Sequence, residues 1–312
     1  MADVALERSI PAAPRTRRAG RRLAWLEPWT YLSPALALIA LLMLVPLVVG
    51  MSYAFQQLQL LNPFKRGWVV TANLEAVLRD PVFWNALGNT VEWTFASLLL
   101  QFALGFGLAL LLREPFFGRR VVQALVFVPW AVPSFLSGLT FAWLFNPVIG
   151  PLPHWLAALG LLAAPDNILG DPRLALWGPI AANVWWGVPF FAITLLAALQ
   201  AIPDEMYEAA AIDGASAWGR FRHVTIPYLT PTIAITLLLR TIWIANFGDL
   251  VWVMTGGGPA NSTQILPTYI FTMAFRKLDF GYASALALVL LALLLLYAVL
   301  LLGARRRLRS PA

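Results

Sequence analysis

Six stretches of mostly apolar residues dominate the hydropathy pattern of this chain, and polar segments separate them. They run approximately from Trp29 to Tyr53, Gly88 to Leu112, Val121 to Phe145, Leu174 to Leu199, Pro231 to Met254 and Tyr282 to Gly303. A helix of about 20 apolar residues crosses the roughly 30 Å hydrocarbon core of a bilayer. The pattern therefore predicts an all-α integral membrane protein with six transmembrane helices.

Prolines interrupt the third and fourth of these spans, at Pro129, Pro133, Pro179 and Pro189. Inside a soluble helix each proline would remove a backbone hydrogen bond and cost about 3 kcal/mol. Transmembrane helices tolerate proline where neighbouring helices bind the freed carbonyl groups. We therefore expect these two spans to be kinked and packed inside a bundle. The first span is longer than the apolar part of a cleaved signal peptide, so we expect it to be retained.

The distribution of Lys and Arg predicts the orientation, because basic residues accumulate on the cytoplasmic side of membrane proteins. Most of them lie in segments that share a side with the N-terminus: Arg8, Arg15, Arg17, Arg18, Arg21, Arg22, Arg113, Arg119, Arg120, Arg220, Arg222, Arg305, Arg306, Arg307 and Arg309. The other side receives fewer: Lys65, Arg66, Arg79, Arg173, Arg276 and Lys277. Both termini are therefore predicted to be cytoplasmic.

Composition agrees with a membrane protein, since 60% of the residues are hydrophobic and 12% are charged, whereas a typical soluble domain is about 25% charged. The net charge of +7 flanks the apolar runs, which indicates membrane topology and no nucleic-acid partner. The chain has no cysteine, and its two histidines, His154 and His223, stand far apart. We therefore expect neither a disulfide nor a metal site.

The domain organisation follows from the spans. Residues 1–26 are predicted to be a disordered cytoplasmic tail, residues 27–304 a six-helix transmembrane domain, and residues 305–312 a basic cytoplasmic tail. The connection of residues 54–87 is long enough to contain some helix. Two short interfacial helices are expected at His154 to Ala164 and Ile265 to Arg276.

The connection between the fourth and fifth spans, residues 200–230, has the signals of two short helices. Pro203 suits a first helical turn, and Asp204 with Glu205 opposes the positive end of the helix dipole. Gly214 suits a left-handed C-cap. A second helix is expected to place Trp218 and Phe221 on one face and to end before Ile226-Pro227. The simplest interpretation is a hairpin that only connects two spans; the alternative is a docking surface for another protein.

The sequence of this connection resembles the EAA loop of binding-protein-dependent ABC importer permeases. The match covers Ile202-Pro203, Tyr207-Glu208-Ala209-Ala210, Ile212-Asp213-Gly214-Ala215 and Ile226-Pro227. Further segments resemble the carbohydrate branch, which includes the maltose and glycerol-phosphate permeases. They are Phe83 to Thr90, Thr255-Gly256-Gly257-Gly258-Pro259, and Gly281 with Ala283-Ser284-Ala285.

The resemblance implies a role, partners and a location. The chain would be a non-catalytic permease subunit of an ATP-driven sugar or polyol importer in the bacterial inner membrane. Its partners would be a homologous permease, two ATPase subunits that bind ATP and Mg, and a periplasmic or lipid-anchored binding protein. The coupling residues carried over are Glu208, Ala209, Ala210, Asp213 and Gly214. The chain itself lacks a P-loop sequence, so no cofactor is expected on it.

Polar and aromatic residues at bilayer depth are the candidates for the substrate pathway, because a charge at a helix centre costs roughly 2.5–3.5 kcal/mol on insertion scales. Arg240 is the deepest charge, with a structural or a functional role open. Asn183, Gly187 and Phe190 share one helical face, which offers an amide, a gap and a ring to a sugar. The family resemblance adds three residues of the fifth span: Trp243, Asn246 and Phe247.

Two other classes of protein compete with the permease. A secondary transporter coupled to ions would need buried carboxylates in broken helices, and only Glu92 and Asp249 lie near the spans. A membrane-embedded glycosyltransferase would need acids that converge at one membrane face. The acids of residues 200–230 fit a docking helix better. The sequence does not identify which sugar is carried.

Overall fold

The computed structural model describes residues 27–62, 64, 66–162, 164 and 166–309. The predicted tail of residues 1–26 lies outside this part of the chain. The structure divides into two units, Met1–Gly50 and Met51–Ala312. In the first unit, helix α1 (Glu27–Ile39) passes through a π-helical turn, η2 (Ala40–Leu44), into α2 (Val45–Tyr53). Together they make an apolar helical segment long enough to cross a membrane.

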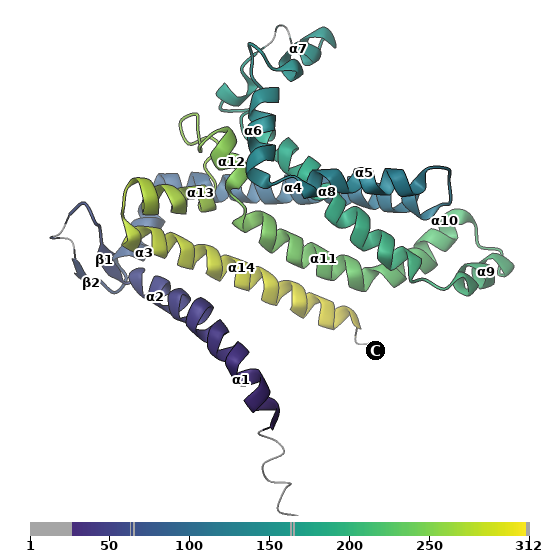
Figure 1. Cartoon of the computed structure of the whole chain (residues 1–312), viewed down its shortest axis with the longest axis horizontal. Helices are drawn as coiled ribbons and strands as arrows, with labels where there is room; N and C mark the ends of the chain where they lie inside the picture. The colour runs from purple at the N-terminus through teal and green to yellow at the C-terminus, as the bar shows by residue number, and fades with distance from the viewer. Residues whose placement is uncertain (1–26, 63, 65, 163, 165, 310–312) are drawn as a thin grey trace, which may run out of the picture. The chain divides into compact units, whose positions relative to one another are not determined.

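The second unit contains the remaining elements (Figure 1). The long helices are α4 (Pro81–Arg113), α8 (Trp177–Gln200), α11 (Ile226–Asn246) and α14 (Phe280–Arg309). The shorter helices are α3 (Ala72–Arg79), α5 (Arg119–Ala131), α6 (Ser134–Leu144), α7 (Pro151–Ala158), α9 (Asp204–Ile212), α10 (Ala217–Arg220), α12 (Asp249–Met254) and α13 (Leu266–Phe271). A 3₁₀ turn, η3 (Ile168–Gly170), and two π turns, η4 (Phe221–Thr225) and η5 (Thr272–Arg276), complete the helical elements.

The predicted membrane fold is confirmed, with one span more strongly bent than expected. Within the described residues, five helical segments are long and apolar enough to cross a membrane, and α5 with α6 would make a sixth. The expected kink in Val121 to Phe145 is a bend of 93° between α5 and α6. It falls at Val132-Pro133, where both residues adopt extended backbone. The indole of Trp186 donates to the carbonyl of Val132 at 3.0 Å, which satisfies the group that the bend leaves free.

The second helix of the predicted hairpin does not end before Ile226-Pro227, which corrects the sequence expectation. Instead, α10 continues through the π turn η4 directly into α11, and Ile226 is helical. Pro227 lacks an amide hydrogen, and a π turn widens the backbone ladder at the point where that hydrogen bond is missing. The same sequence of π turn and proline occurs at η2, two residues before Pro46.

The long helices of the second unit run side by side, and their ends carry different elements (Figure 1). At one end lie α9 and α10. At the other end lie α3, α13 and a two-stranded antiparallel sheet, β1 (Gln56–Leu58) and β2 (Arg66–Trp68), in which Gln57 is paired with Gly67. The sheet was not predicted. Helices are present at both positions where interfacial helices are expected: α7 begins before His154 and ends at Ala158, and α13 with η5 runs from Leu266 to Arg276. Their place at a membrane interface stays a prediction.

Helices α4 and α8 approach closely through Gly105. A Cβ atom at this position would lie 2.5 Å from the Cβ of Phe191 and 3.0 Å from the carbonyl oxygen of Val188. Only glycine fits at such a crossing, and small residues are what allow membrane helices to pack backbone to backbone. The buried side chains of Leu195 and Leu199 continue this core toward the end that carries α9.

An acidic residue organises the opposite end of the bundle. Asp80 caps α4 by accepting from the amide of Val82 at 2.8 Å, and it also accepts from the hydroxyls of Tyr269 and Tyr282. Burial alone would raise the pKa of Asp80, but these three hydrogen bonds and the charge of Lys277 lower it below its ordinary value. The carboxylate thereby connects the start of α4 to α13 and α14.

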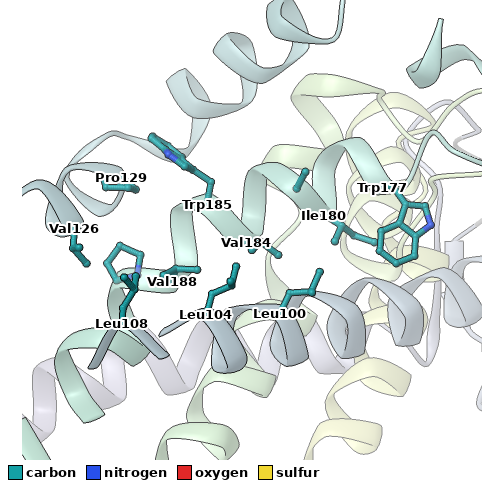
Figure 2. A pocket seen from close by; sticks show the side chains of 12 residues that line it. Leu100, Leu104, Leu108, Val126, Pro129, Trp177, Ile180, Val184, Trp185 and Val188 are labelled. Atoms are coloured by element: carbon teal, nitrogen blue, oxygen red, sulfur yellow. The ribbon is translucent and has the colours of Figure 1, made fainter. Parts of the chain in front are cut away.

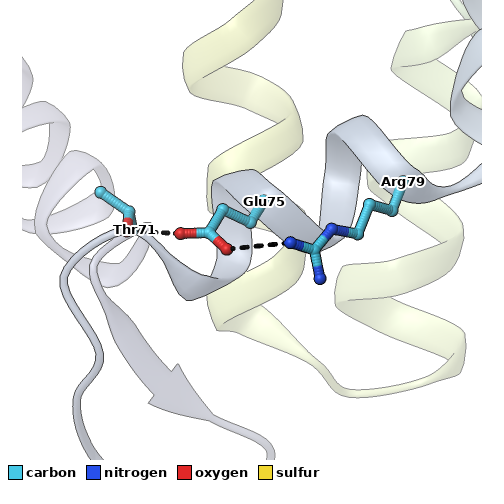
Figure 3. A network of polar contacts seen from close by, with 3 residues as sticks. All are labelled: Thr71, Glu75 and Arg79. Atoms are coloured by element: carbon cyan, nitrogen blue, oxygen red, sulfur yellow. Dashed lines mark hydrogen bonds and ion pairs between the residues drawn. The ribbon is translucent and has the colours of Figure 1, made fainter.

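A second polar network at this end is exposed to solvent. Glu75 of α3 accepts from the hydroxyl of Thr71 at 2.9 Å and forms an ion pair with Arg79 at 3.4 Å (Figure 3). Exposed pairs of this kind contribute about 0.3–0.5 kcal/mol within a helix. Glu75 is therefore an exposed acidic residue at the end of the bundle opposite α9.

Candidate functional site

The side chain of Arg240 lies in the interior of the bundle with 1% of its surface exposed. Its Nε donates to Oε1 of Gln101 on α4 at 2.8 Å. Gln101 is itself fully buried and donates from Nε2 to the backbone carbonyl of Asn183 on α8 at 2.9 Å. Three helices are thus joined by one chain of hydrogen bonds that begins at a charged group.

Aromatic rings surround the same guanidinium group. Its carbon atom lies 5.5 Å from the ring centroid of Trp186, 5.5 Å from that of Phe190 and 5.1 Å from that of Trp243. Each ring presents a negative face to the cation, which is worth about 2 kcal/mol or more in a desolvated setting. The rings therefore offset part of the several kcal/mol that burying one ion costs.

Hydrogen-bonding capacity remains unused around Arg240. Both terminal nitrogens of Arg240, both side-chain polar atoms of Asn183, and Oγ of Ser97 are buried without a partner among the described residues. Ser97 and Gln101 lie one turn apart on α4, on the side that faces α8. A buried polar group without a partner costs roughly 1–3 kcal/mol, so this arrangement is expensive unless it serves a ligand.

Gly187 creates the space that the guanidinium occupies. A Cβ atom on Gly187 would overlap Nη2 of Arg240 and the side-chain amide of Gln101. The predicted face of Asn183, Gly187 and Phe190 is therefore directed at Arg240, and Trp243 closes the same group from α11. These five predicted residues form one cluster, which we call the Arg240 site together with Gln101, Ser97 and Trp186.

Two predicted pathway residues lie outside this cluster. Phe247 stacks on Trp186 with a centroid distance of 5.3 Å, so it supports the Arg240 site from behind one ring. Asn246 is exposed and donates to the carbonyl of Ile242 at 3.2 Å. It lines a separate hollow of about 450 Å³ with Asp249, Trp252 and Phe271. In that hollow Asp249 accepts from the hydroxyl of Ser134 at 2.9 Å.

Sequence reasoning did not identify Gln101, Ser97 or Trp186 as members of the site. The signal for Gln101 was present, since it is an amide within the second apolar span. Polar side chains at bilayer depth are candidates for a functional role by default. Gln101 meets this criterion in the same way as Arg240. The contact between Trp186 and Arg240 could not be inferred, because it depends on how α8 and α11 cross.

A groove on the outside of the bundle has different chemistry. It encloses about 490 Å³ between α4, α5 and α8, and its lining is apolar throughout. Leu104 and Val188 form its floor, and Pro129 and Trp185 face them from α5 and α8 (Figure 2). It offers no polar partner to a sugar, so the groove is not a candidate for the substrate site.

The second candidate site is the hairpin of α9 and α10. Gly214 joins the two helices with φ of +78°, the left-handed conformation that was predicted for it. Glu208, Ala209, Asp213 and Gly214 are exposed, and Ala210 is half-buried. The hairpin also exposes large apolar side chains: Ile212 is 86% exposed and Trp218 68%.

Side chains from α4 and η4 hold this hairpin. The guanidinium of Arg113 lies 4.2 Å from the ring centroid of Tyr207 and donates to its hydroxyl at 2.9 Å. The same hydroxyl lies 3.0 Å from Oγ1 of Thr225. Trp218 stacks on Phe221 at 5.4 Å, as the predicted shared face requires. A polar hollow of about 480 Å³ lies between these residues and Glu208.

Comparison with known proteins gives one consistent result. Residues 101–310 match the family described as "Binding-protein-dependent transport system inner membrane component". The trehalose/maltose transport system permease of Thermococcus litoralis is 37% identical over 78% of this chain and 81% of its own length. The sulfoquinovosyl glycerol transport system permease of Agrobacterium fabrum is 35% identical over 92% of each chain.

The fold has a counterpart among solved structures. A chain of a bacterial ABC transporter that imports the acidic polysaccharide alginate superimposes with a TM-score of 0.79. The superposition covers 94% of this chain and all of the other, at 23% sequence identity. At that identity the likeness concerns the fold.

Proposed function

Because this chain belongs to the inner membrane components of binding-protein-dependent transport systems, we propose that it forms half of the translocation pathway of an ATP-driven importer for sugars or polyols. It is a multi-pass membrane protein and an ABC transporter permease. Ion-coupled transport and glycosyl transfer are therefore not favoured. The substrate class, the coupling residues and the partners are the parts that the proposal adds.

The exposed hairpin of α9 and α10 is the observation that carries coupling to ATP hydrolysis. Ile212 and Trp218 present large apolar side chains at the end of the bundle, beside an acidic residue, Glu208. Exposed apolar surface of this kind marks protein interaction sites. Glu208 would make the polar contact with an ATPase subunit, Ala209 and Ala210 would allow close approach, and Asp213-Gly214 would fix the turn.

The hairpin is suited to transmit movement of an ATPase subunit to the membrane helices. Tyr207 connects α9 to the end of α4 through Arg113 and to η4 through Thr225, and η4 continues into α11 without a break. A displacement of α9 would therefore be transmitted to α4 and α11, the helices that hold Gln101 and Arg240. Closure of the ATPase subunits would in this way change access to the Arg240 site.

The proposed assembly follows from the family. A second, homologous permease would complete the pathway, two ATPase subunits would bind ATP and Mg, and a periplasmic or lipid-anchored binding protein would deliver the substrate. The chain would have no catalytic activity and no cofactor of its own. Both termini and the α9–α10 hairpin would face the cytoplasm of a bacterium, with the protein in the inner membrane.

The Arg240 site supports a saccharide substrate. Sugars present C–H faces that pack on aromatic rings and hydroxyls that need hydrogen-bond partners. Phe190, Trp243 and the supporting ring of Phe247 would supply the first kind of contact. Asn183 and Arg240 would supply the second, with Gly187 leaving room for the guanidinium. Asn246 would contact the substrate nearer the mouth of the pathway. Relatives that transport trehalose and maltose, and sulfoquinovosyl glycerol, agree with this class.

Substitution of Glu208 tests the coupling proposal. We expect Glu208→Arg to abolish co-purification of the ATPase subunits from mild detergent and to stop uptake into proteoliposomes. A charge reversal at a docking contact replaces attraction with repulsion and leaves an unpaired charge in the interface. Mass spectrometry of the purified wild-type complex identifies the ATPase, the second permease and the binding protein.

Glu75→Arg is the matched control, because it makes the same charge change at an exposed acid (Figure 3) of α3, which lies at the end of the bundle opposite α9 (Figure 1). It should leave assembly and uptake unchanged. Normal ATPase binding and normal uptake in Glu208→Arg would overturn the role of the hairpin. Recovery of the wild-type chain alone, with uptake that needs no ATP, would overturn the importer itself.

A further inference from the structure

The charge of Arg240 exceeds what a neutral sugar needs. Hydroxyl groups can be bound by amides and backbone groups, which cost far less to bury than a guanidinium. Within the cluster, Asn183, Gln101 and Ser97 already offer neutral hydrogen-bonding groups. A neutral substrate alone therefore does not explain why a cation is buried at this depth.

Nothing in the described part of the chain neutralises Arg240. The ion pair found there joins Glu75 and Arg79 on α3. The two acids closest to the spans are occupied elsewhere or directed outward: Asp249 accepts from Ser134, and Glu92 is exposed on α4. The partners of the guanidinium are one neutral amide and three aromatic rings.

The terminal nitrogens of the guanidinium are buried without a hydrogen-bond partner among the described residues. Gln101 binds Nε, and both Nη1 and Nη2 lack an acceptor. This pair of nitrogens forms the planar fork that binds two oxygens of a carboxylate, sulfonate or phosphate at once. Trp243, which is 41% exposed, and the half-buried Phe190 both lie against the guanidinium.

We propose that the Arg240 site binds a negatively charged group on the transported saccharide, so that the substrate class is an acidic sugar. The proposal rests on the importer function above. Nη1 and Nη2 of Arg240 would hold two oxygens of the acidic group, and Asn183 with Ser97 would bind neighbouring oxygens. The aromatic rings stabilise the cation while no anion is bound and pack on the sugar when one is.

The experiment uses the complete complex of both permeases and the ATPase subunits in lipid nanodiscs. The probes are glucuronate and glucose, which differ in one carboxylate, and sodium sulfate as a free anion at matched ionic strength. Affinity is measured by calorimetry and by tryptophan fluorescence, since Trp186 and Trp243 lie against Arg240. We expect glucuronate to bind at least about tenfold more tightly than either glucose or sulfate, the scale of one charge-assisted bidentate contact.

Two variants separate anion binding from a structural role. Arg240→Gln should weaken glucuronate binding more than glucose binding and so remove the preference for glucuronate. Gln101→Glu places a carboxylate at the partner of Arg240 and supplies an internal counter-ion, so it should also remove the preference. Because it pairs a buried charge, this second variant remains informative even where Arg240→Gln fails to assemble.

Several results would overturn the proposal. They are equal affinity of the wild type for glucuronate and glucose, sulfate binding as tight as glucuronate, an equal loss of both sugars in Arg240→Gln, or a retained preference in Gln101→Glu. With the ATPase subunits still bound, each of these leaves the importer function standing. Failure of the wild-type chain to bind an ATPase at all would instead remove the importer function.

Discussion

The guanidinium of Arg113, the last residue of α4, lies over the ring of Tyr207 and donates to its hydroxyl at 2.9 Å. Tyr207 belongs to α9, the exposed helix that we propose as the contact for an ATPase subunit. Because the same hydroxyl also lies 3.0 Å from Thr225, one phenol group joins the hairpin to two membrane helices. The strength of this junction should determine how well movement of α9 reaches the pathway.

Removal of the Tyr207 hydroxyl tests the junction. Tyr207→Phe keeps the ring beside Arg113 and loses both hydrogen bonds, at a cost of about 1–3 kcal/mol because one partner is charged. We expect the complex to assemble normally but to transport less substrate for each ATP hydrolysed. The measurement is the ratio of uptake to ATP hydrolysis in proteoliposomes.

Tyr228→Phe is the control, since Tyr228 lies near the start of α11 and is 46% exposed. It should leave the ratio at its wild-type value. An unchanged ratio in Tyr207→Phe would show that the hairpin is coupled to the membrane helices through its backbone and not through this hydroxyl.

The crossing of α4 and α8 gives a prediction on stability. Gly105→Ala should lower the free energy of unfolding by about 1–3 kcal/mol, because an added methyl group forces the two helices apart. Its Cβ would lie 2.5 Å from the Cβ of Phe191. The loss is measured as a decrease in the thermal unfolding midpoint of the purified chain in detergent.

Gly107 on the same helix offers a matched control, because a Cβ atom there meets nothing within 4 Å. Gly107→Ala should be neutral or slightly stabilising, since alanine favours helix over glycine by about 1 kcal/mol. Equal midpoints for Gly105→Ala and Gly107→Ala would contradict the close crossing.

Hydropathy predicts the spans of this protein because each has to present an apolar surface about 20 residues long. The 93° bend is harder to predict. Pro133 indicates an interruption, but its angle depends on Trp186 of another helix, which binds the carbonyl of Val132. The continuous path from α10 to α11 was also missed, because proline normally marks a helix boundary and the π turn that accommodates Pro227 has no sequence signal.

In the Arg240 site, too, the features within one helix can be predicted from sequence, whereas the contacts between helices cannot. Helical spacing placed Asn183, Gly187 and Phe190 on one face, and the structure directs that face at Arg240. Spacing within one helix contains no information on which helix lies opposite. The interaction of Gln101 with Arg240 joins residues 139 positions apart, so it requires the packed bundle.

The carboxylate of Asp80 gives a prediction on pH dependence. Its pKa in the folded protein is below the ordinary value of 3.8, so the carboxylate contributes stability above that pH, and the contribution is lost as pH falls through the lowered pKa. Asp80→Asn should lower the free energy of unfolding by about 1–3 kcal/mol near neutral pH. The difference from wild type should shrink as pH falls below 3.8 and through the lowered pKa, at which the native residue also becomes neutral.

Unfolding midpoints at neutral and acidic pH, measured for both proteins in the same detergent, provide this comparison. Asp166→Asn is the control, because Asp166 is exposed and, among the described residues, its side chain accepts a local hydrogen bond from the neighbouring amide of Asn167. A difference between Asp80→Asn and wild type that stayed constant over the whole pH range would mean that the ionised form of Asp80 has no special role.

Two segments that resemble the carbohydrate permeases, one at the start of α4 and one after α12, lie together in the structure. Nδ2 of Asn89 on α4 donates to the carbonyls of Ser262 and Gln264, both at 3.0 Å, in the loop that follows Gly256 to Gly258. Asn89→Asp removes the donor and faces those carbonyls with a carboxylate, so residues 255–264 should exchange amide hydrogens faster. Asn85→Asp is the exposed comparison, since Nδ2 of Asn85 donates to a single carbonyl among the described residues, that of Asn261, and it should have a smaller effect. Equal exchange in Asn89→Asp and wild type would mean that the backbone hydrogen bonds of the loop hold it without α4.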